Sequence, residues 1–378
     1  MQTRRSFISS ATLATAALAS SQLPNLAFGQ PISERDTLEQ PTHQVAAKSD
    51  IVLPGKIGLG GVALGNGFHE NTNQQIQQTL AASWDAGIRY YDTSPFYGFG
   101  LSERRLGHFL FEKERKDFVI STKVGRLFEA DRNYKKDPKS LWYGNLNFKY
   151  KYDYTASGVR RSVEDSLLRL GLSSIDYVFV HDLSPDNGDF GPKWVDQFAI
   201  AQKGAFPELS KMRAEGLIKG WGMGVNTPEP ILKSMEVADP DLMLVAIQYS
   251  LVDHEHALND LFPAMDKKGI KAVLGGPLNS GFLGGKPRFN YSANIPAEMQ
   301  SKKDKIAAIS AKHGVALVTL SLQFAAAHPI VSSVIPGASI AVQAIENAAA
   351  LTKPVPPALW KELIANKLIS AKAPLPMS

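Results

Sequence analysis

Four residues with side chains suited to proton transfer lie at or just after the ends of short apolar runs in the first half of the chain. Asp92, Lys123 and His181 each close such a run, and Tyr97 follows Asp92 by five residues. A buried lysine is costly unless it is paired, so we expect Lys123 to bind the Asp92 carboxylate. Taken singly, each residue has an ordinary role in a turn, on a surface or in a core. Together they predict one catalytic cluster.

The chemistry of this cluster follows from its residue types. A phenol has an unperturbed pKa of about 10, and a neighbouring ammonium lowers it, so we expect Lys123 to lower the pKa of Tyr97. A neutral imidazole donates a hydrogen bond, which would let His181 orient a substrate oxygen. Such a set exchanges a proton with an alcohol or carbonyl oxygen. No side chain carries hydride, so the reaction requires a nicotinamide.

Short apolar segments without alternation recur along the chain, each followed by an amphipathic segment. The expected strands are 57–61, 88–92, 118–123, 175–181, 218–225, 244–248, 270–274 and 331–335. The expected helices are 72–86, 102–111, 159–170, 206–215, 230–237, 258–268, 302–312, 317–327, 341–351 and 359–367. This order predicts an α/β protein, a (β/α)8 TIM barrel of eight parallel strands with a long loop at 124–155 after the third strand. A doubly wound sheet is the competing fold, but Gly60-Gly61 leads into a polar loop and not into the helix of a dinucleotide fingerprint.

The composition argues against several other classes of protein. The chain has 378 residues, a hydrophobic content of 44% and a net charge of +5, which does not indicate a nucleic-acid or membrane surface. It has no cysteine, which excludes disulfides, thiolate metal sites and cysteine nucleophiles. Its eight histidines lack the spacing of metal ligands, so we expect no metal.

Residues 1–30 are similar to a twin-arginine signal peptide. Arg4-Arg5 opens the segment, and a weakly apolar stretch and a small-residue cleavage site follow in the usual order. The alternative is an unstructured N-terminus with a chance arginine pair. Residues 31–50 have the composition of a linker. We expect the twin-arginine export machinery to deliver the folded protein to the periplasm, with the mature domain at 51–378 free of the membrane and its cofactor still bound.

Across residues 52 to 352 the chain resembles the aldo-keto reductase superfamily. The motifs that carry the resemblance are Gly58–Gly61, Asp92–Gly98, Ser102–Gly107, Ser121–Gly125, Ser166–Leu172 and Asp176–Asp182. The His181-Asp182 pair, the aromatic insertion after the third strand and Gly275–Gly281 are most similar to the branch that contains aldose 1-dehydrogenases and a pyridoxal dehydrogenase. The resemblance implies that Tyr97 is the proton donor or acceptor and that Asp92 and Lys123 tune it. It also implies that His181 orients the substrate.

The resemblance further implies NAD or NADP as the cofactor. It places Asn226 and Gln248 at the nicotinamide carboxamide, which needs both a donor and an acceptor. The other matched cofactor positions are Gly60, Gly61, Asp92, Leu278, Ser280, Gly281, Gly337, Ser339, Gln343 and Asn347. Gly275 stands where many members stack an aromatic ring on the nicotinamide. NAD is favoured, because Ser339 and Gln343 stand where NADP-using members place basic residues; Lys302 and Lys303 are the alternative source of positive charge.

The predicted substrate contacts are Phe96, Phe128, Trp142 and Tyr143, with His181. Aromatic faces beside polar groups suit a sugar, and equally a pyridine ring or an aromatic aldehyde. The leading hypothesis is an NAD(P)-dependent oxidoreductase that interconverts an aldehyde, ketone or sugar hemiacetal with its alcohol or lactone. One alternative is a redox-sensing or cofactor-binding barrel subunit with little turnover. Another is a lyase or isomerase with Lys123 as a Schiff base, although the expected Asp92 partner opposes the loss of the lysine proton.

Overall fold

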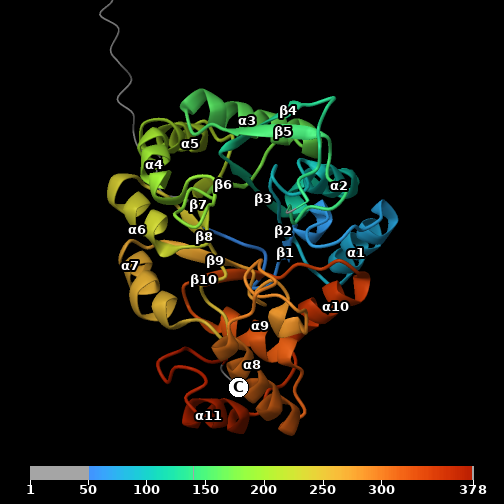
Figure 1. Cartoon of the computed structure of the whole chain (residues 1–378), viewed down its shortest axis with the longest axis vertical. Helices are drawn as coiled ribbons and strands as arrows, with labels where there is room; N and C mark the ends of the chain where they lie inside the picture. Colours follow the sequence, from blue (N-terminus) through green and yellow to red (C-terminus); the bar gives the residue numbers. More distant parts are fainter. Residues whose placement is uncertain (1–50, 139, 377–378) are drawn as a thin grey trace, which may run out of the picture. The chain divides into compact units, whose positions relative to one another are not determined.

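Eight parallel strands form a barrel in the computed structural model of the chain, which describes residues 51–376 except residue 139 (Figure 1). The strands are β1 Leu59–Gly60, β2 Tyr90–Asp92, β3 Val119–Val124, β6 Tyr177–His181, β7 Gly220–Val225, β8 Leu242–Ala246, β9 Lys271–Gly275 and β10 Val331–Ile335. They pair in this order. Parallel bridges from Ile57 to Val334 and from Gly60 to Gly337 join the first and last strands. The predicted (β/α)8 barrel is confirmed.

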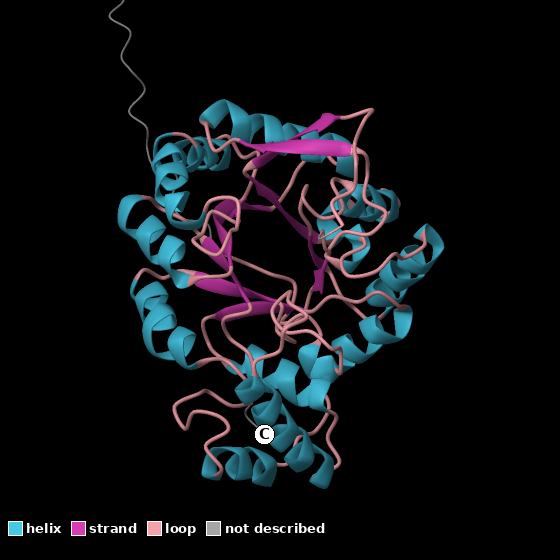
Figure 2. Ribbon diagram, viewed as in Figure 1, coloured by secondary structure: helices cyan, strands magenta, loops and turns pink. Residues whose placement is uncertain are grey.

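Helices surround the strands on the outside, as Figure 2 shows. They are α1 Asn73–Asp85, α2 Leu101–Leu110, α3 Ala156–Leu170, α4 Trp194–Lys203, α5 Ala205–Ala214, α6 Pro228–Val237, α7 Phe262–Lys267, α8 Ala297–Lys312, α9 Leu317–Ala327, α10 Ala341–Ala350 and α11 Pro357–Ala365. Short 3-10 turns cover Ala63–Gly65, Arg115–Asp117, Gly191–Lys193 and Phe282–Gly284, and a π turn covers Ala257–Leu261.

The two faces of each strand contribute to two different cores. In β6, Val178 and Val180 pack in the large cluster between the sheet and the helices. Tyr177 and Phe179 pack in the smaller cluster inside the barrel. Because strand side chains alternate between faces, His181 continues the interior row of β6. The interior rows of β2 and β3 likewise end in acidic and basic residues, which brings the polar ends of three neighbouring strands to one mouth of the barrel.

The predicted loop at 124–155 contains an antiparallel hairpin, β4 Arg126–Ala130 and β5 Phe148–Tyr152. In Figure 1 the hairpin lies at the edge of the barrel beside α3. Helix α4 was also absent from the expected elements. The sixth strand ends at Ala246, two residues before the predicted end, because the backbone turns at Ile247.

Two further expectations concern the ends of the chain and the membrane. The predicted signal peptide at 1–30 and the linker at 31–50 lie outside the described residues. Within 51–376, no single helix is long and apolar enough to cross a bilayer; α8 and α9 reach that length only together, across a bend of 105°.

Candidate active site

Asp92 and Lys123 meet inside the barrel, where β2 and β3 run side by side. Lys123 Nζ donates to Asp92 Oδ2 at 2.7 Å and to the carbonyl oxygen of Thr93 at 2.8 Å. Ser121 Oγ donates to the other carboxylate oxygen at 2.7 Å. Both charged side chains are almost fully buried, at 2% and 1% exposure. Burial raises the pKa of Asp92, and the contacts with Lys123 and Ser121 oppose that rise.

Tyr97 lies in the loop between β2 and α2, with its ring against the ion pair. Lys123 Nζ is 4.7 Å from the centroid of the Tyr97 ring. The ring also packs edge-on against His181 at 5.8 Å and, tilted by 35°, against Trp142 at 5.5 Å, both measured between centroids. The structure therefore brings together all four residues of the predicted cluster.

The expected downward shift of the Tyr97 pKa was wrong. Burial raises the pKa of Tyr97 well above 10, and the negative charges of Asp92 and Asp182 raise it further. The Lys123 ammonium does not reverse this effect, because the Asp92 carboxylate at 2.7 Å offsets its charge. Tyr97 is consequently held as a neutral phenol, which can donate a proton.

His181 is buried and engaged at both ring nitrogens. Nδ1 lies 3.1 Å from Ser94 Oγ, and Nε2 lies 3.2 Å from Asp182 Oδ1. Ser94 Oγ accepts the backbone N–H of Phe96, which leaves its own proton for Nδ1; on this ground we assign the imidazole proton to Nε2. Burial, with the charges of Lys123 and Arg126, lowers the pKa of His181 well below 6.5. The lowered pKa agrees with the neutral imidazole expected for His181.

A second ion pair lies beside His181, and the sequence reasoning did not assign it to the site. Arg126 Nη1 donates to Asp182 Oδ2 at 2.9 Å, and Nη2 donates to the Tyr152 hydroxyl at 2.8 Å. The guanidinium carbon lies 3.9 Å from the centroid of the Phe96 ring, and Arg126 is 5% exposed. Burial lowers the pKa of Arg126, but Asp182 and the neighbouring tyrosines outweigh it and raise the pKa. The guanidinium is therefore charged.

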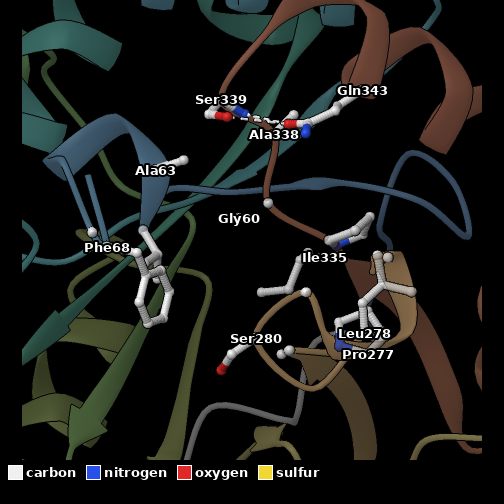
Figure 3. A pocket seen from close by; sticks show the side chains of 18 of the residues that line it. Gly60, Ala63, Phe68, Pro277, Leu278, Ser280, Ile335, Ala338, Ser339 and Gln343 are labelled. Atoms are coloured by element: carbon white, nitrogen blue, oxygen red, sulfur yellow. Dashed lines mark hydrogen bonds between the residues drawn. The ribbon is translucent and has the colours of Figure 1, made fainter. Parts of the chain in front are cut away.

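A cavity of about 270 Å³ lies beside Tyr97 and Asp92, which both line it. Figure 3 shows two of its walls: Leu278 and Ser280 on the loop after β9, and Ser339 and Gln343 after β10. The predicted cofactor residues that line it are Gly60, Gly61, Asp92, Leu278, Ser280, Gly281, Gly337, Ser339, Gln343 and Asn347. Residues from four separate segments of the sequence thus surround one cavity, which Tyr97 also lines.

Backbone forms much of the cavity wall, because several glycines leave no room for a side chain. A Cβ on Gly60 would lie 2.7 Å from the carbonyl oxygen of Ile335, and one on Gly61 would lie 2.7 Å from that of Asp92. Gly276 has a positive φ of 60°, and a Cβ there would lie 2.8 Å from Ile247 Cγ2. Close backbone approach of this kind lets N–H groups reach an anionic ligand.

Gln248 is not among the residues that line this cavity, but it has the property that a carboxamide ligand requires. Its Nε2 and Oε1 atoms are both buried without a hydrogen-bond partner. The preceding Ile247 has a φ of +59°, an unusual conformation for a β-branched residue, which turns the chain at this point. Asn226, the second predicted carboxamide contact, donates from Nδ2 to Asp186 Oδ2 at 2.9 Å. A ligand that brings one donor and one acceptor would satisfy Gln248.

The charged groups at the cavity differ from those expected. Lys302 donates to the carbonyl oxygen of Val252 at 2.8 Å, and Lys303 Nζ lies 4.4 Å from the centroid of the Phe282 ring. Neither lysine lines the cavity. The charged residues that do line it, apart from Asp92, are Lys286, Arg288 and Glu346. Nothing in their sequence spacing singles them out.

Two of the four aromatic residues predicted at the substrate contact the cluster. Phe96 packs against His181 at 6.3 Å, and Trp142 packs against both Phe96 and Tyr97 at 5.5 Å. Trp142 is 3% exposed, and its Nε1 has no partner. The structure does not bring the other two to Tyr97. Phe128 packs against Phe99 at 5.6 Å, and Tyr143 is 43% exposed.

The chain matches the Aldo/keto reductase family over residues 56–365. It is 36% identical over 338 residues to D-threo-aldose 1-dehydrogenase of a Pseudomonas species, which covers 87% of this chain and 98% of the relative. Its identity to pyridoxal 4-dehydrogenase of Microbacterium luteolum is also 36%, over 83% of this chain and 94% of the relative.

Solved structures share the fold. A glycerol dehydrogenase from Gluconobacter oxydans superposes with a TM-score of 0.62 at 22% identity, over 88% of this chain and 96% of that one. In the part of the chain that the structure describes, no group of three or more histidine or acidic side chains is arranged to hold a metal ion. The family match over most of the chain, the barrel and the two curated relatives agree: this protein belongs to the aldo/keto reductase family of oxidoreductases.

Proposed function

We propose that this protein is an NAD(P)-dependent oxidoreductase that interconverts an aldehyde, ketone or sugar hemiacetal with its alcohol or lactone, with Tyr97 as the general acid. The observation that carries the proposal is the position of the neutral Tyr97 phenol, which lines the large cavity and packs against Lys123 and His181. The names of the two relatives at 36% identity, an aldose and a pyridoxal dehydrogenase, support a small sugar or aldehyde as substrate.

When bound, a nicotinamide would be the source of the hydride that reduction of a carbonyl carbon requires. Tyr97 gives its proton to the carbonyl oxygen, so that one carbonyl, one hydride and one proton become one alcohol. The His181 Nε2–H donates to the same oxygen and holds it toward the phenol. Lys123 Nζ then lies 4.7 Å from the centroid of the phenolate ring, and the charge of Arg126 offsets part of the cost that Asp92 and Asp182 impose on that anion. In oxidation, the same phenolate receives the proton.

The residues that would hold the nicotinamide cofactor are those around the cavity, together with Gln248, which is not part of the cavity lining. The unpaired Gln248 carboxamide suits the nicotinamide amide. The glycine-lined loop from Gly276 to Gly281 suits a pyrophosphate, because small residues let backbone N–H groups approach its oxygens. These features fit the group that the chemistry requires.

We favour NAD over NADP. Glu346 lines the cavity on the helix that carries Gln343 and Asn347, and its carboxylate would repel a 2′-phosphate. Arg288 and Lys286 are the basic residues at the cavity, and Arg288 is partly engaged, since Nε donates to the carbonyl oxygen of Ser280 at 2.6 Å and its guanidinium covers Phe68. Titrating the protein with NAD⁺ and NADP⁺ tests this preference. Glu346→Gln should tighten the binding of NADP⁺ and leave NAD⁺ nearly unchanged.

The proposed activity is tested by following nicotinamide absorbance over a panel of aldoses, aldehydes and alcohols. Turnover that disappears in Tyr97→Phe supports it. Binding of NAD⁺ without turnover on any substrate would instead favour a cofactor-binding subunit. Borohydride trapping of a Lys123 adduct would favour the Schiff-base alternative, which the contacts of Nζ with Asp92 and Thr93 oppose.

Export forms a separate part of the proposal. We infer from Arg4-Arg5 that the protein reaches the periplasm folded, with its cofactor inside the barrel. Replacing both arginines with lysine should retain the protein in the cytoplasm, as cell fractionation would show. Denaturing the mature protein should release one nucleotide per chain; finding none would contradict transport of the cofactor.

A further inference from the structure

Asp182 follows His181 and lies where the chain leaves β6. Its φ is +49°, a conformation that aspartate adopts more readily than most residues. Its backbone is fixed there, because its N–H donates to the carbonyl oxygen of Gly224 at 3.2 Å and its carbonyl oxygen accepts from Asn187 Nδ2 at 2.9 Å. This turn directs the carboxylate back to the His181 ring, with Oδ1 at 3.2 Å from Nε2.

An oxygen atom therefore already lies beside the imidazole nitrogen that faces the reaction. Nδ1 is engaged by Ser94, so a substrate oxygen can accept a hydrogen bond only from Nε2. When the reacting oxygen takes that N–H, Asp182 Oδ1 loses its donor. A carboxylate oxygen without a donor in a partly buried site is unfavourable, and a hydroxyl of the ligand can supply a new donor there.

Arg126 prevents the carboxylate from turning away. It holds Oδ2 at 2.9 Å, and the Phe96 and Tyr152 rings enclose its guanidinium at 3.9 Å and 4.7 Å. The Asp182 side chain keeps 23% exposure, which leaves it open to a ligand. Asp182 also contributes to the raised pKa of Tyr97, which shows that its charge acts at the reacting group.

We propose that Asp182 accepts a hydrogen bond from a substrate hydroxyl on the carbon next to the reacting carbon, with Arg126 as its positioning residue. The substrate is then a sugar hemiacetal or another α-hydroxy carbonyl compound, and simple aldehydes are poor substrates. This inference rests on the proposed oxidoreductase function and narrows its substrate class. A site built to receive a hydroxyl discriminates against the analogue that lacks it, because its own polar group is left unpaired.

The test compares two aldehyde probes that differ by two hydroxyls, one on the α carbon and one on the β carbon. Glyceraldehyde and propanal share a three-carbon aldehyde, and only the first carries the α-hydroxyl. With NADH, the wild-type protein should reduce glyceraldehyde with a kcat/KM about tenfold or more above that for propanal. Asp182→Asn should bring the ratio close to one, mainly through a higher KM for glyceraldehyde, because asparagine keeps the shape and the backbone conformation but accepts the hydroxyl more weakly.

Two further variants separate recognition from stability. Arg126→Lys keeps a charge near Asp182 and should give an intermediate ratio. Asp241→Asn is the matched control, because Asp241 forms a buried pair with Arg213 just before β8, at the other end of the barrel. It should lower the free energy of unfolding and leave the substrate ratio unchanged.

The outcomes distinguish a failure of the proposed hydroxyl site from a failure of the proposed oxidoreductase function. Equal wild-type turnover of both aldehydes would overturn the hydroxyl site while leaving the oxidoreductase in place. If neither aldehyde turns over, saturation-transfer NMR on the NAD-loaded protein measures the same preference as binding. Failure of glyceraldehyde to bind would also overturn the inference, and only a lack of turnover over the whole panel would overturn the function.

Discussion

The two buried ion pairs of the site, Asp92–Lys123 and Asp182–Arg126, differ in how fully the chain satisfies them. In the first pair both carboxylate oxygens and the ammonium have protein partners, and exposure does not exceed 2%. In the second, the carboxylate is 23% exposed and Arg126 Nε has no partner. A sealed pair supplies a fixed charge beside Tyr97. A pair with an unbonded N–H and a partly exposed carboxylate can still form hydrogen bonds with a ligand.

The sealed pair has a functional role only if Tyr97 transfers the proton, so the largest expected effect comes from the phenol itself. Tyr97→Phe removes one hydroxyl and keeps the ring that packs on Trp142 and His181. We expect kcat to fall by about 10²–10⁴-fold, while the Kd for NAD⁺ stays within about a factor of two. Steady-state kinetics and a fluorescence titration measure the two quantities. Unchanged turnover would remove Tyr97 from the mechanism.

The next prediction compares the pairs directly through stability. Lys123→Met leaves Asp92 buried without its counter-charge and should cost about 3–5 kcal/mol of unfolding free energy. Arg126→Met leaves Asp182 partly in contact with water, so its cost should be smaller, about 1–2 kcal/mol. Urea denaturation gives both values.

The double variant Asp92→Asn with Lys123→Met is the control for that comparison. It removes both charges together and should recover part of the loss caused by Lys123→Met. Equal costs for Lys123→Met and Arg126→Met would contradict the distinction between a sealed and an open pair.

The sequence located the sealed pair and failed to identify the open one, for a physical reason. A polar residue that closes an apolar run is visible without a structure, and strand alternation then fixes its face, as for Asp92, Lys123 and His181. Asp182 faces His181 because of one left-handed backbone angle, which composition does not reveal. Arg126 depends on a hairpin, although the alternation of aromatic residues and lysine in Phe148–Tyr152 is a usable strand signal.

The error in the Tyr97 pKa has a related cause. Residue types show which charges are near, and they correctly indicated an ammonium beside the phenol. They do not show how much of that charge a second partner offsets, nor how deeply the hydroxyl is buried. Burial is the largest cause of the raised Tyr97 pKa, and the charges of Asp92 and Asp182 add to it. The cofactor cavity was more predictable, since its wall follows from glycines at strand ends whose positions the motifs fix.

The distinction between groups that protein partners satisfy fully and groups that they satisfy in part also applies to the buried histidines. It predicts how the unfolding free energy depends on pH. His254 is sealed: its Nδ1 lies 3.0 Å from the carbonyl oxygen of Ser250, and its Nε2 accepts the N–H of Ser370 at 3.1 Å. Burial, with the charge of Lys302, lowers the pKa of His254 to about 4. The unfolded chain, with a histidine pKa of about 6.5, then binds the proton first as the pH falls.

Stability contributed by His254 is therefore present above about pH 6.5 and is lost as the pH falls toward 4, by up to about 3 kcal/mol in total. His254→Gln does not titrate, and its unfolding free energy should decline less between pH 7 and pH 4.5. Urea denaturation of both proteins across this range measures the difference. Because His181 titrates equally in both proteins, identical slopes would show that His254 contributes no such pH dependence.

The smallest expected effect tests whether Gln248 binds the cofactor or has only a structural role. The Gln248 carboxamide is buried and its two polar atoms have no hydrogen-bond partner in the described structure. It therefore lowers the unfolding free energy and can form hydrogen bonds with a ligand. Gln248→Leu should raise the Kd for NAD⁺ by about tenfold, the loss of one to two hydrogen bonds. It should leave the unfolding free energy of the cofactor-free protein equal or slightly higher. A structural glutamine would show the reverse, with lower stability and unchanged cofactor binding.

Calorimetric titration of NAD⁺ and denaturation of the same preparation decide between the two roles. Gln323→Leu is a matched control, because Gln323 donates to the carbonyl oxygens of Ala350 and Lys353. This variant should have a lower unfolding free energy and an unchanged Kd for NAD⁺.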